Sequence, residues 1–221
     1  MGETRRELEA KLVVPDETTL AALARIERIG YLHVRPRGCR LQQDTYVDTR
    51  SLRLLRAGYA CRLRHVGHRA FATLKGLGGA AGALHEREEI EEEIDNPSIG
   101  ALLRMTEPPG RLARWLAGGE QVVPLFILVT LRRLAMVTSG PHECFEMALD
   151  RARFFGPAGE MLFLEAELES LDGDRDLLEQ AAGELRRAHG LTASGLSKFE
   201  RGLRWAGVAA NCPELARGPS N

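Results

Sequence analysis

The sequence of 221 residues predicts an α+β fold, in which strands with alternating charged and apolar residues are separated by short helices. The segment 5–14, RRELEAKLVV, shows the alternation first. Side chains of a strand point to opposite faces in turn, so Glu7, Glu9 and Lys11 share one face while apolar residues take the other. The same period recurs along the chain, whereas other segments carry the caps and apolar spacing of helices.

The predicted elements follow one another as strands with helical interruptions. Strands are expected at 5–14, 41–49, 58–66, 69–77, 128–138, 143–155 and 160–171. Residues 84–94, LHEREEIEEEI, fit a strand or an exposed helix. Helices are expected at 15–30, with Asp16 and Gly30 as caps, within 97–119, from Asp174 to His189 with Gly190 as its end, and at 194–206. Residues 76–83 are expected to form a flexible loop that lacks the sequence context of a P-loop.

Composition limits the classes of function. Thirty basic and thirty-one acidic residues give a net charge of −1, which offers no reason to expect binding to nucleic acid or to an anionic membrane. No apolar run approaches the roughly 20 residues of a membrane span, and the N-terminus lacks the apolar core of a signal peptide. Four cysteines lie far apart, which favours scattered half-buried thiols over a disulfide framework or a zinc site. We therefore expect a cytoplasmic protein.

The charged faces of the strands differ in sign, which suggests more than a surface exposed to water. Acidic segments near the two ends of the chain flank central segments that carry Arg62, Arg64 and Lys75. Such faces could still form an open sheet with one wet side. Paired carboxylates, however, are ligands for Mg²⁺ or Mn²⁺, and arginine and lysine bind phosphate oxygens. If the strands close into a barrel, both kinds of residue line one cavity, as metal-assisted phosphoryl chemistry requires.

In their order along the chain, these motifs resemble the CYTH superfamily, the triphosphate tunnel metalloenzymes. The resemblance begins with Glu-x-Glu-x-Lys at 7–11 and continues through TYVDT (45–49), LLRAGYACRLR (54–64), TLKG (73–76) and LHEREEIE (84–91). It ends with LRR, ALD, LEAELE and LSKFERGL (196–203). Its coverage predicts one domain at 1–207 and a disordered tail or linker at 208–221. Ile90 departs from the pattern, because many relatives have an aromatic residue there.

The resemblance implies a closed antiparallel β-barrel of about eight strands, a tunnel, with helices packed outside. It implies that a divalent cation, Mg²⁺ or Mn²⁺, is held by Glu7, Glu9, Glu165 and Glu167. The phosphates would be bound by Lys11, Arg62, Arg64, Lys75, Arg87, Arg132 and Lys198. Lys11 and Glu89 are the predicted catalytic residues. A structural or a direct role is left open for Tyr46 and Asp48, and no role is assigned to Glu91, Asp150, Glu169 or Arg201.

The expected function is metal-dependent hydrolysis of inorganic triphosphate to pyrophosphate and phosphate, partly because GALHEREEIEEEI resembles bacterial CYTH proteins with that activity. Water would attack the terminal phosphorus in line. An adenylyl cyclase of the class IV type, or a thiamine or nucleoside triphosphatase, is the alternative on the same scaffold. A non-catalytic polyphosphate-binding module is the alternative of another class. The expected partner is a small-molecule triphosphate, without nucleic acid or membrane, and a homodimer is left open.

Overall fold

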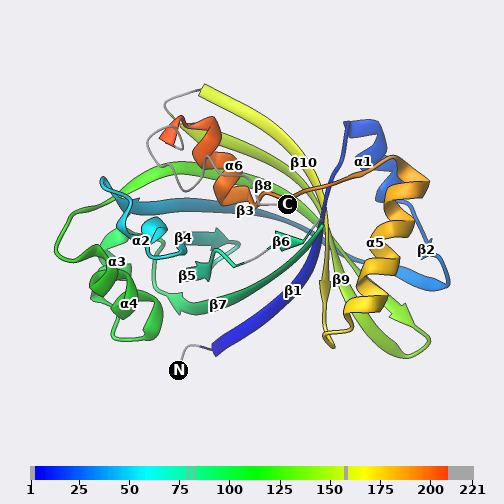
Figure 1. Cartoon of the computed structure of the whole chain (residues 1–221), viewed down its shortest axis with the longest axis horizontal. Helices are drawn as coiled ribbons and strands as arrows, with labels where there is room; N and C mark the ends of the chain where they lie inside the picture. The colour runs from blue at the N-terminus through cyan, green and yellow to red at the C-terminus, as the bar shows by residue number, and fades with distance from the viewer. Residues whose placement is uncertain (1–2, 79, 82, 157–158, 209–221) are drawn as a thin grey trace.

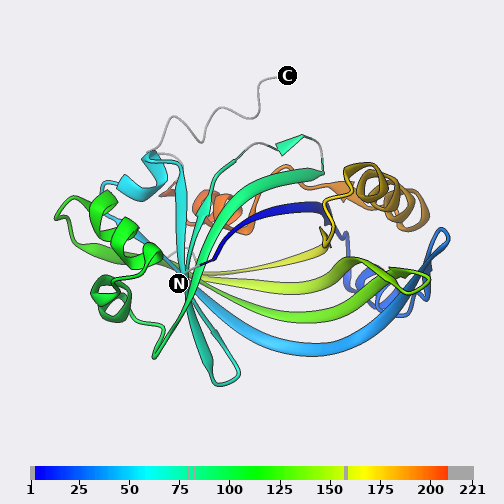
Figure 2. The ribbon, with the colours of Figure 1, turned by 90° about the horizontal axis from the view of Figure 1, so that it is seen from below.

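Eight long strands close into an antiparallel barrel, which confirms the predicted α+β tunnel fold. The computed structural model describes residues 3–78, 80–81, 83–156 and 159–208. Within them the barrel strands are β1 (Glu3–Val13), β3 (Leu32–Thr49), β4 (Tyr59–Val66), β5 (Arg69–Gly76), β7 (Leu84–Ile94), β8 (Val122–Ser139), β9 (His142–Gly156) and β10 (Gly159–Ser170). Their order is β1-β10-β9-β8-β3-β4-β5-β7, and β7 pairs with β1 to close the ring. Figures 1 and 2 show the long curved strands from two sides.

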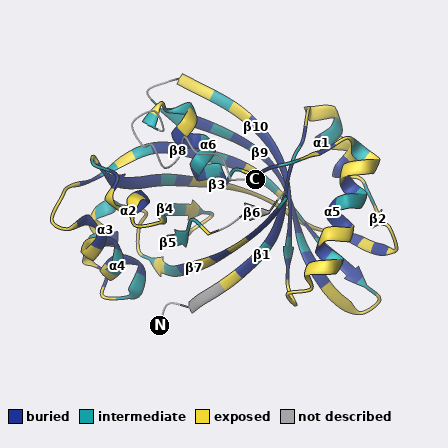
Figure 3. Cartoon of the chain, viewed as in Figure 1, coloured by how far each residue is buried: buried dark blue, intermediate teal, exposed yellow. Residues whose placement is uncertain are grey.

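Helices pack on the outside of the barrel in two groups. The first, α1 (Glu17–Leu23) and α5 (Arg175–His189), shares an apolar core with the outer faces of β1, β9 and β10. The second, α2 (Arg53–Arg56), α3 (Ile99–Arg104) and α4 (Pro108–Ala117), covers β4 and β5. Figure 3 shows that α5 has a buried and an exposed side. No helix in the described part of the chain is long and apolar enough to cross a bilayer.

Short strands extend the edges of this sheet. β2 (Arg28–Ile29) pairs with β3, β6 (Ala80–Ala81) with β7, and β11 (Thr192–Ala193) with β1. β6 lies within the segment 76–83, which the sequence predicts as a loop. These two-residue strands escape sequence analysis because a periodic pattern needs more residues to become visible.

The helix predicted at 15–30 is shorter than expected. Asp16 caps it as predicted, because its Oδ1 accepts a hydrogen bond from a backbone N–H of the first turn (2.7 Å), but α1 ends at Leu23, with Ala24 as its C-cap. Gly30 is not its cap: it has φ +58° and lies at the turn from β2 into β3. The prediction is wrong there because Ile29 is buried under the helices and pairs with β3 instead of continuing the helix.

Other boundaries also shift. The strand predicted at 41–49 is the second half of β3, which begins at Leu32 and passes Pro36 with a shift in its register against β8. Residues 84–94 form a strand, and the helix that ends at Gly190 is confirmed. The last helix begins at Lys198 rather than 194. Residues 209–221, nearly all of the predicted tail, lie outside the described residues.

The cysteines differ from the half-buried thiols that the sequence suggests. Cys39 is exposed, whereas Cys61 and Cys144 are buried, and all three are free thiols. Cys212 lies outside the described residues.

The inner face of the barrel changes from apolar to charged along its strands. On β8, Leu128 and Arg132 have the same parity and point to the same side, as do Phe154 and Asp150 on β9. Strand pairing sets Leu128 opposite Phe154 and Arg132 opposite Asp150. The change from apolar to charged residues therefore lies at one level of the barrel, and a charged compartment adjoins an apolar one.

Helix α6 (Lys198–Trp205) fills the apolar compartment. Its Phe199 and Leu203 are buried in one cluster with Phe126, and a capping box fixes its first turn. Gly202 lies so close to the Phe126 ring that a Cβ atom would overlap it. This docking places Lys198, the first residue of the helix, at the border of the charged compartment.

Gly202→Ala should destabilise the protein, although alanine is the better helix former. The methyl group has no room against the ring of Phe126, and overpacking of this kind costs about 1 to 3 kcal/mol. Gly183 in α5 is the matched control, because its Cβ would meet only the end of the Arg187 side chain, at 3.2 Å. Gly183→Ala should stabilise the protein by roughly 0.5 to 1 kcal/mol. Urea unfolding measures both variants, and equal shifts would contradict the docking of α6.

Candidate active site

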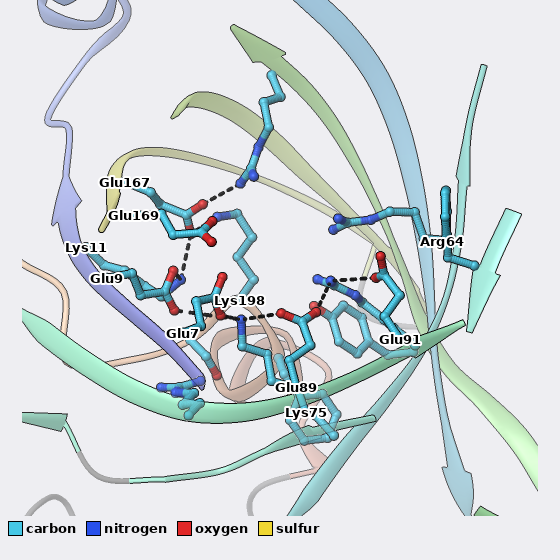
Figure 4. A pocket seen from close by; sticks show the side chains of 18 of the residues that line it. Glu7, Glu9, Lys11, Arg64, Lys75, Glu89, Glu91, Glu167, Glu169 and Lys198 are labelled. Carbon is cyan, nitrogen blue, oxygen red and sulfur yellow. Dashed lines mark hydrogen bonds and ion pairs between the residues drawn. The ribbon is translucent and has the colours of Figure 1, made fainter. Parts of the chain in front are cut away.

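A cavity of about 600 Å³ occupies the charged compartment, and all eight barrel strands and α6 contribute to its lining. Of the twelve residues predicted for the site, all but Glu165 line this cavity; strand alternation accounts for the ten on strands, and Lys198 comes from α6. Glu165 is fully buried behind the lining. Figure 4 shows Glu9, Lys11 and Glu167 together on one side and Arg64 with Glu91 on the other. The positions follow from the barrel, while the roles of these residues stay predictions.

Lys11 joins the two acidic strands. Its Nζ donates to Glu9 Oε2 on β1 and to Glu167 Oε1 on β10, each at 2.7 Å. This bridge forms because β1 and β10 are neighbours and Lys11 lies opposite Glu167 in their register. Burial opposes the charge on Glu9, but Lys11 and Lys75 outweigh it and lower the pKa of Glu9 to about 2. Glu9 is therefore ionised at neutral pH.

Lys75 gathers a second group of carboxylates. It forms an ion pair with Glu7, and its Nζ lies 3.6 Å from Glu89 Oε2 and 3.8 Å from Glu9 Oε1. Arg62 donates to Glu89 Oε1 at 2.8 Å. Glu89, the predicted catalytic carboxylate, is thus held between two cations, which lower its pKa in spite of its burial. Lys75 and Arg62 therefore favour the ionised form of Glu89, which can bind a cation.

Three buried carboxylates meet at the wall formed by β9 and β10. Asp150, Glu165 and Glu167 each offer one oxygen, and these atoms all lie within 4.8 Å of one another. Asp150 lies opposite Glu165 in the strand pairing, which brings it into the cluster although the sequence analysis assigns it no role. Burial and the neighbouring Glu167 raise the pKa of Glu165 to about 7, with Lys198 opposing.

This three-carboxylate cluster fits a divalent cation. Carboxylate oxygens are the ligands that Mg²⁺ and Mn²⁺ prefer. Within the cluster, Glu165 Oε1 is buried and has no hydrogen-bond partner among the described residues, which is costly unless a cation binds there. Glu7 and Glu9 do not belong to the cluster; they line the cavity on β1, the strand beside β10, and their role as metal ligands stays a prediction.

The charges of the cavity lining are balanced. Among the described residues that line it, nine side chains are basic and nine are acidic. A polyphosphate that entered alone would meet repulsion as well as attraction, and the buried acids behind the lining would add to the repulsion. A polyphosphate together with divalent cations avoids this conflict, because each finds partners of opposite charge. The cavity is therefore suited to a metal–polyphosphate complex.

Two buried residues that the sequence analysis did not identify hold phosphate-binding candidates in place. Asp44 accepts two hydrogen bonds from Arg64, at 2.7 and 2.9 Å. His85 Nδ1 accepts from Arg87 at 2.7 Å, so its Nε2 carries the proton and donates to the Ser194 carbonyl at 2.7 Å. Asp44 shares a face with Tyr46, and His85 with Arg87, because each pair is two residues apart. That spacing is the signal that could have revealed them.

Comparison with known proteins gives one family. A model of the CYTH domain family matches residues 5–203. The structure is similar to a protein from Hippeastrum that was proposed to be an adenylyl cyclase and has a dominant triphosphatase activity, with a TM-score of 0.69 and 21% identity over 90% of this chain and 95% of that one.

Two further solved structures have the same fold. A proposed adenylate cyclase from Bacillus halodurans has a TM-score of 0.63 and 18% identity, covering 90% of this chain and 97% of that one. A protein from Pyrococcus horikoshii has a TM-score of 0.55 and 18% identity, covering 89% and 98%. At these identities the likeness shows a common fold.

Asp44→Asn should lower the stability of the protein at neutral pH and make that stability less sensitive to acid pH. Burial opposes the charge of Asp44, but Arg64 outweighs it and lowers the pKa. Its stabilisation is therefore complete above the unfolded-state pKa of about 4 and is lost as the pH falls through the lower folded-state pKa. Breaking a buried ion pair costs about 3 kcal/mol. The free energy of unfolding of wild type at pH 7 should therefore exceed that of the variant by about this amount. The difference should shrink below about pH 4.

Urea unfolding between pH 7 and pH 3 provides this comparison. The control is Glu93→Gln, because Glu93 pairs with Arg69 on the exposed surface and should contribute little at any pH. A difference between wild type and Asp44→Asn that stays constant down to pH 3 would show that the Asp44 charge is not stabilised by folding.

Proposed function

The chain belongs to the CYTH family, since the match spans nearly all of it, and we propose that it hydrolyses inorganic triphosphate to pyrophosphate and phosphate with Mg²⁺ or Mn²⁺. The observation that carries this proposal is the cavity lining, in which cations and carboxylates alternate without a large apolar surface. Such a lining complements phosphate oxygens and divalent cations. The dominant triphosphatase activity of the structurally similar Hippeastrum protein supports the same choice.

The aromatic residues of the cavity favour an inorganic substrate over a nucleotide. Three aromatic residues contribute to the described lining, namely Tyr46, Phe71 and Phe199. Tyr46 is 5% exposed and packs against Phe199, with ring centroids 5.3 Å apart, so both belong to the apolar compartment. The ring of Phe71 is covered by the Arg69 guanidinium at 4.7 Å. Among the described lining residues, these rings offer little open surface on which a purine could stack.

Each group of residues in the cavity has its own part in the proposed reaction. The guanidinium groups of Arg62 and Arg64 would bind phosphate oxygens through paired N–H donors. Lys11 would stabilise the negative charge that develops during in-line attack by water. Glu89 would accept the proton of the attacking water. Asp150, Glu165 and Glu167 would hold a divalent cation, with Glu7 and Glu9 beside them on the neighbouring strand β1. When bound, this cation would offset the negative charge of the phosphate oxygens, which otherwise repels the electron pair of an attacking nucleophile.

Two other functions are considered beside hydrolysis of inorganic triphosphate. The names of the structural neighbours include proposed adenylyl cyclases, so a nucleotide triphosphate is the enzymatic alternative on the same scaffold. A non-catalytic polyphosphate-binding module would use the same cations. The buried carboxylate cluster argues against this second alternative, because binding of a polyanion by itself gains nothing from added negative charge.

The choice of substrate is tested by phosphate release. We expect a higher kcat/KM for inorganic triphosphate than for ATP or thiamine triphosphate, because the site offers charge on all sides and little apolar surface for a base. The three substrates are compared at equal concentration with Mg²⁺ or Mn²⁺, and cyclic AMP is measured in the ATP reaction. A higher kcat/KM for ATP, or cyclic AMP as the main product, would favour the cyclase alternative. Tight triphosphate binding without phosphate release would favour the binding module.

Glu9→Gln should abolish turnover without unfolding the barrel. The substitution keeps the shape of the side chain but removes the charge that faces the cavity, and loss of even an outer metal contact costs about 10- to 100-fold. We expect kcat for triphosphate to fall by at least that factor at saturating Mg²⁺, with an unchanged far-UV spectrum. Glu88→Gln is the matched control, because Glu88 is exposed on the opposite face of β7 and should keep full activity. Full activity of Glu9→Gln would remove Glu9 from the site.

A further inference from the structure

The ammonium group of Lys198 lies inside the three-carboxylate cluster. Its Nζ is 2.9 Å from Asp150 Oδ2 and 2.8 Å from Glu167 Oε1, and it forms a third ion pair with Glu165. Figure 4 shows the Lys198 side chain reaching toward Glu167. The ammonium therefore occupies the position among the oxygens that a divalent cation would need.

Lys198 also faces the cavity. It lines the cavity and its side chain is 10% exposed, whereas Glu165 and Asp150 are fully buried. Its backbone is fixed by the capping box and the apolar contacts of α6, but its four-carbon side chain can turn about its own bonds. A change of rotamer is thus enough to move the ammonium from the carboxylates to an anion in the cavity, without any movement of the barrel.

The energetics favour such an exchange only when both ligands are present. A cation that entered alone would have to displace Lys198 and leave its buried ammonium without a partner, which is costly. An anion that attracted Lys198 alone would leave three buried carboxylates facing one another, with Arg132 and Lys11 as partners of Asp150 and Glu167 and none of these cations paired with Glu165. When cation and anion bind together, the carboxylates and Lys198 each gain a new partner.

We propose that Lys198 is an internal competitor for the metal position, and that an anion bound in the cavity draws it away and so strengthens the binding of the divalent cation. This coupling between anion and cation binding rests on the proposed function in one respect, that triphosphate is the natural anion. By linkage, the cation must strengthen the binding of the anion by the same factor. The protein would thereby bind metal and polyphosphate as a pair and bind either one poorly alone.

This role differs from that of an ordinary phosphate-binding lysine. A residue that only binds phosphate would, when replaced, weaken the anion and leave the affinity for metal unchanged or lower. An internal competitor would, when replaced, weaken the anion and strengthen the metal. The pKa of Lys198 is raised, because the three carboxylates outweigh the effect of its burial, so the competitor stays charged.

Binding of Mn²⁺, followed by the electron paramagnetic resonance signal of the free ion, tests the proposal on the full chain. Sulfate serves as the anion, because it resembles a phosphate group, is not hydrolysed and chelates Mn²⁺ only weakly. We expect sulfate to lower the Kd of wild type for Mn²⁺ several-fold. In the absence of sulfate, Lys198→Met should bind Mn²⁺ about tenfold or more tightly than wild type does. The substitution removes a positive charge that lies within 3 Å of the metal ligands. Sulfate should then have little further effect.

Arg204→Gln is the matched control, because Arg204 is exposed on the same helix and its loss changes the net charge equally. It should behave as wild type. A folded Lys198→Met that binds Mn²⁺ no more tightly than wild type would overturn the proposal. If that variant does not fold, the measurement on wild type is sufficient as a test. The absence of any sulfate effect on the Mn²⁺ affinity of wild type would also overturn the proposal. Failure to hydrolyse triphosphate leaves these binding results unchanged and would refute only the proposed function.

Discussion

Every buried carboxylate on the inner face of the barrel needs an opposite charge within reach, because an unpaired ion loses several kcal/mol of hydration when it leaves water. Lys11, Lys75 and Lys198 meet this need, and each bridges carboxylates of different elements. The ion pairs therefore connect β1 with β10, β5 with β7, and α6 with β10. The positions of the strands and of the charges depend on one another.

A charged interior cannot supply the hydrophobic stabilisation of a usual barrel, so the fold places its apolar cores elsewhere. Two lie outside, between the barrel and the helices α1 and α5 or α2 to α4. The third lies inside, at the end that α6 fills. This third core has a second consequence, because the helix that completes it also carries Lys198 into the carboxylate cluster. Stability and site geometry are thus coupled through α6.

The balance of charge gives the site its chemical character. Nine cations and nine carboxylates in one cavity favour neither a free anion nor a free cation, and both find partners when they arrive together. Under the proposed coupling, the ion pairs found in the structure are a resting arrangement, in which protein cations occupy the place of the metal and protein carboxylates occupy the place of phosphate. Such exchange keeps buried charges compensated before and after binding.

The sequence by itself determined which residues share a face, because a period of two needs only the order of residues along the chain. Strand alternation and the ordered motifs were thus sufficient to predict eleven residues of the cavity lining and the closed barrel. Tertiary structure alone decided which charges meet. Asp150 joins Glu165 through the pairing of β9 with β10, and Asp44 meets Arg64 through that of β3 with β4. Strand register and the docking of α6 fix these contacts, and both depend on packing between segments far apart in the sequence.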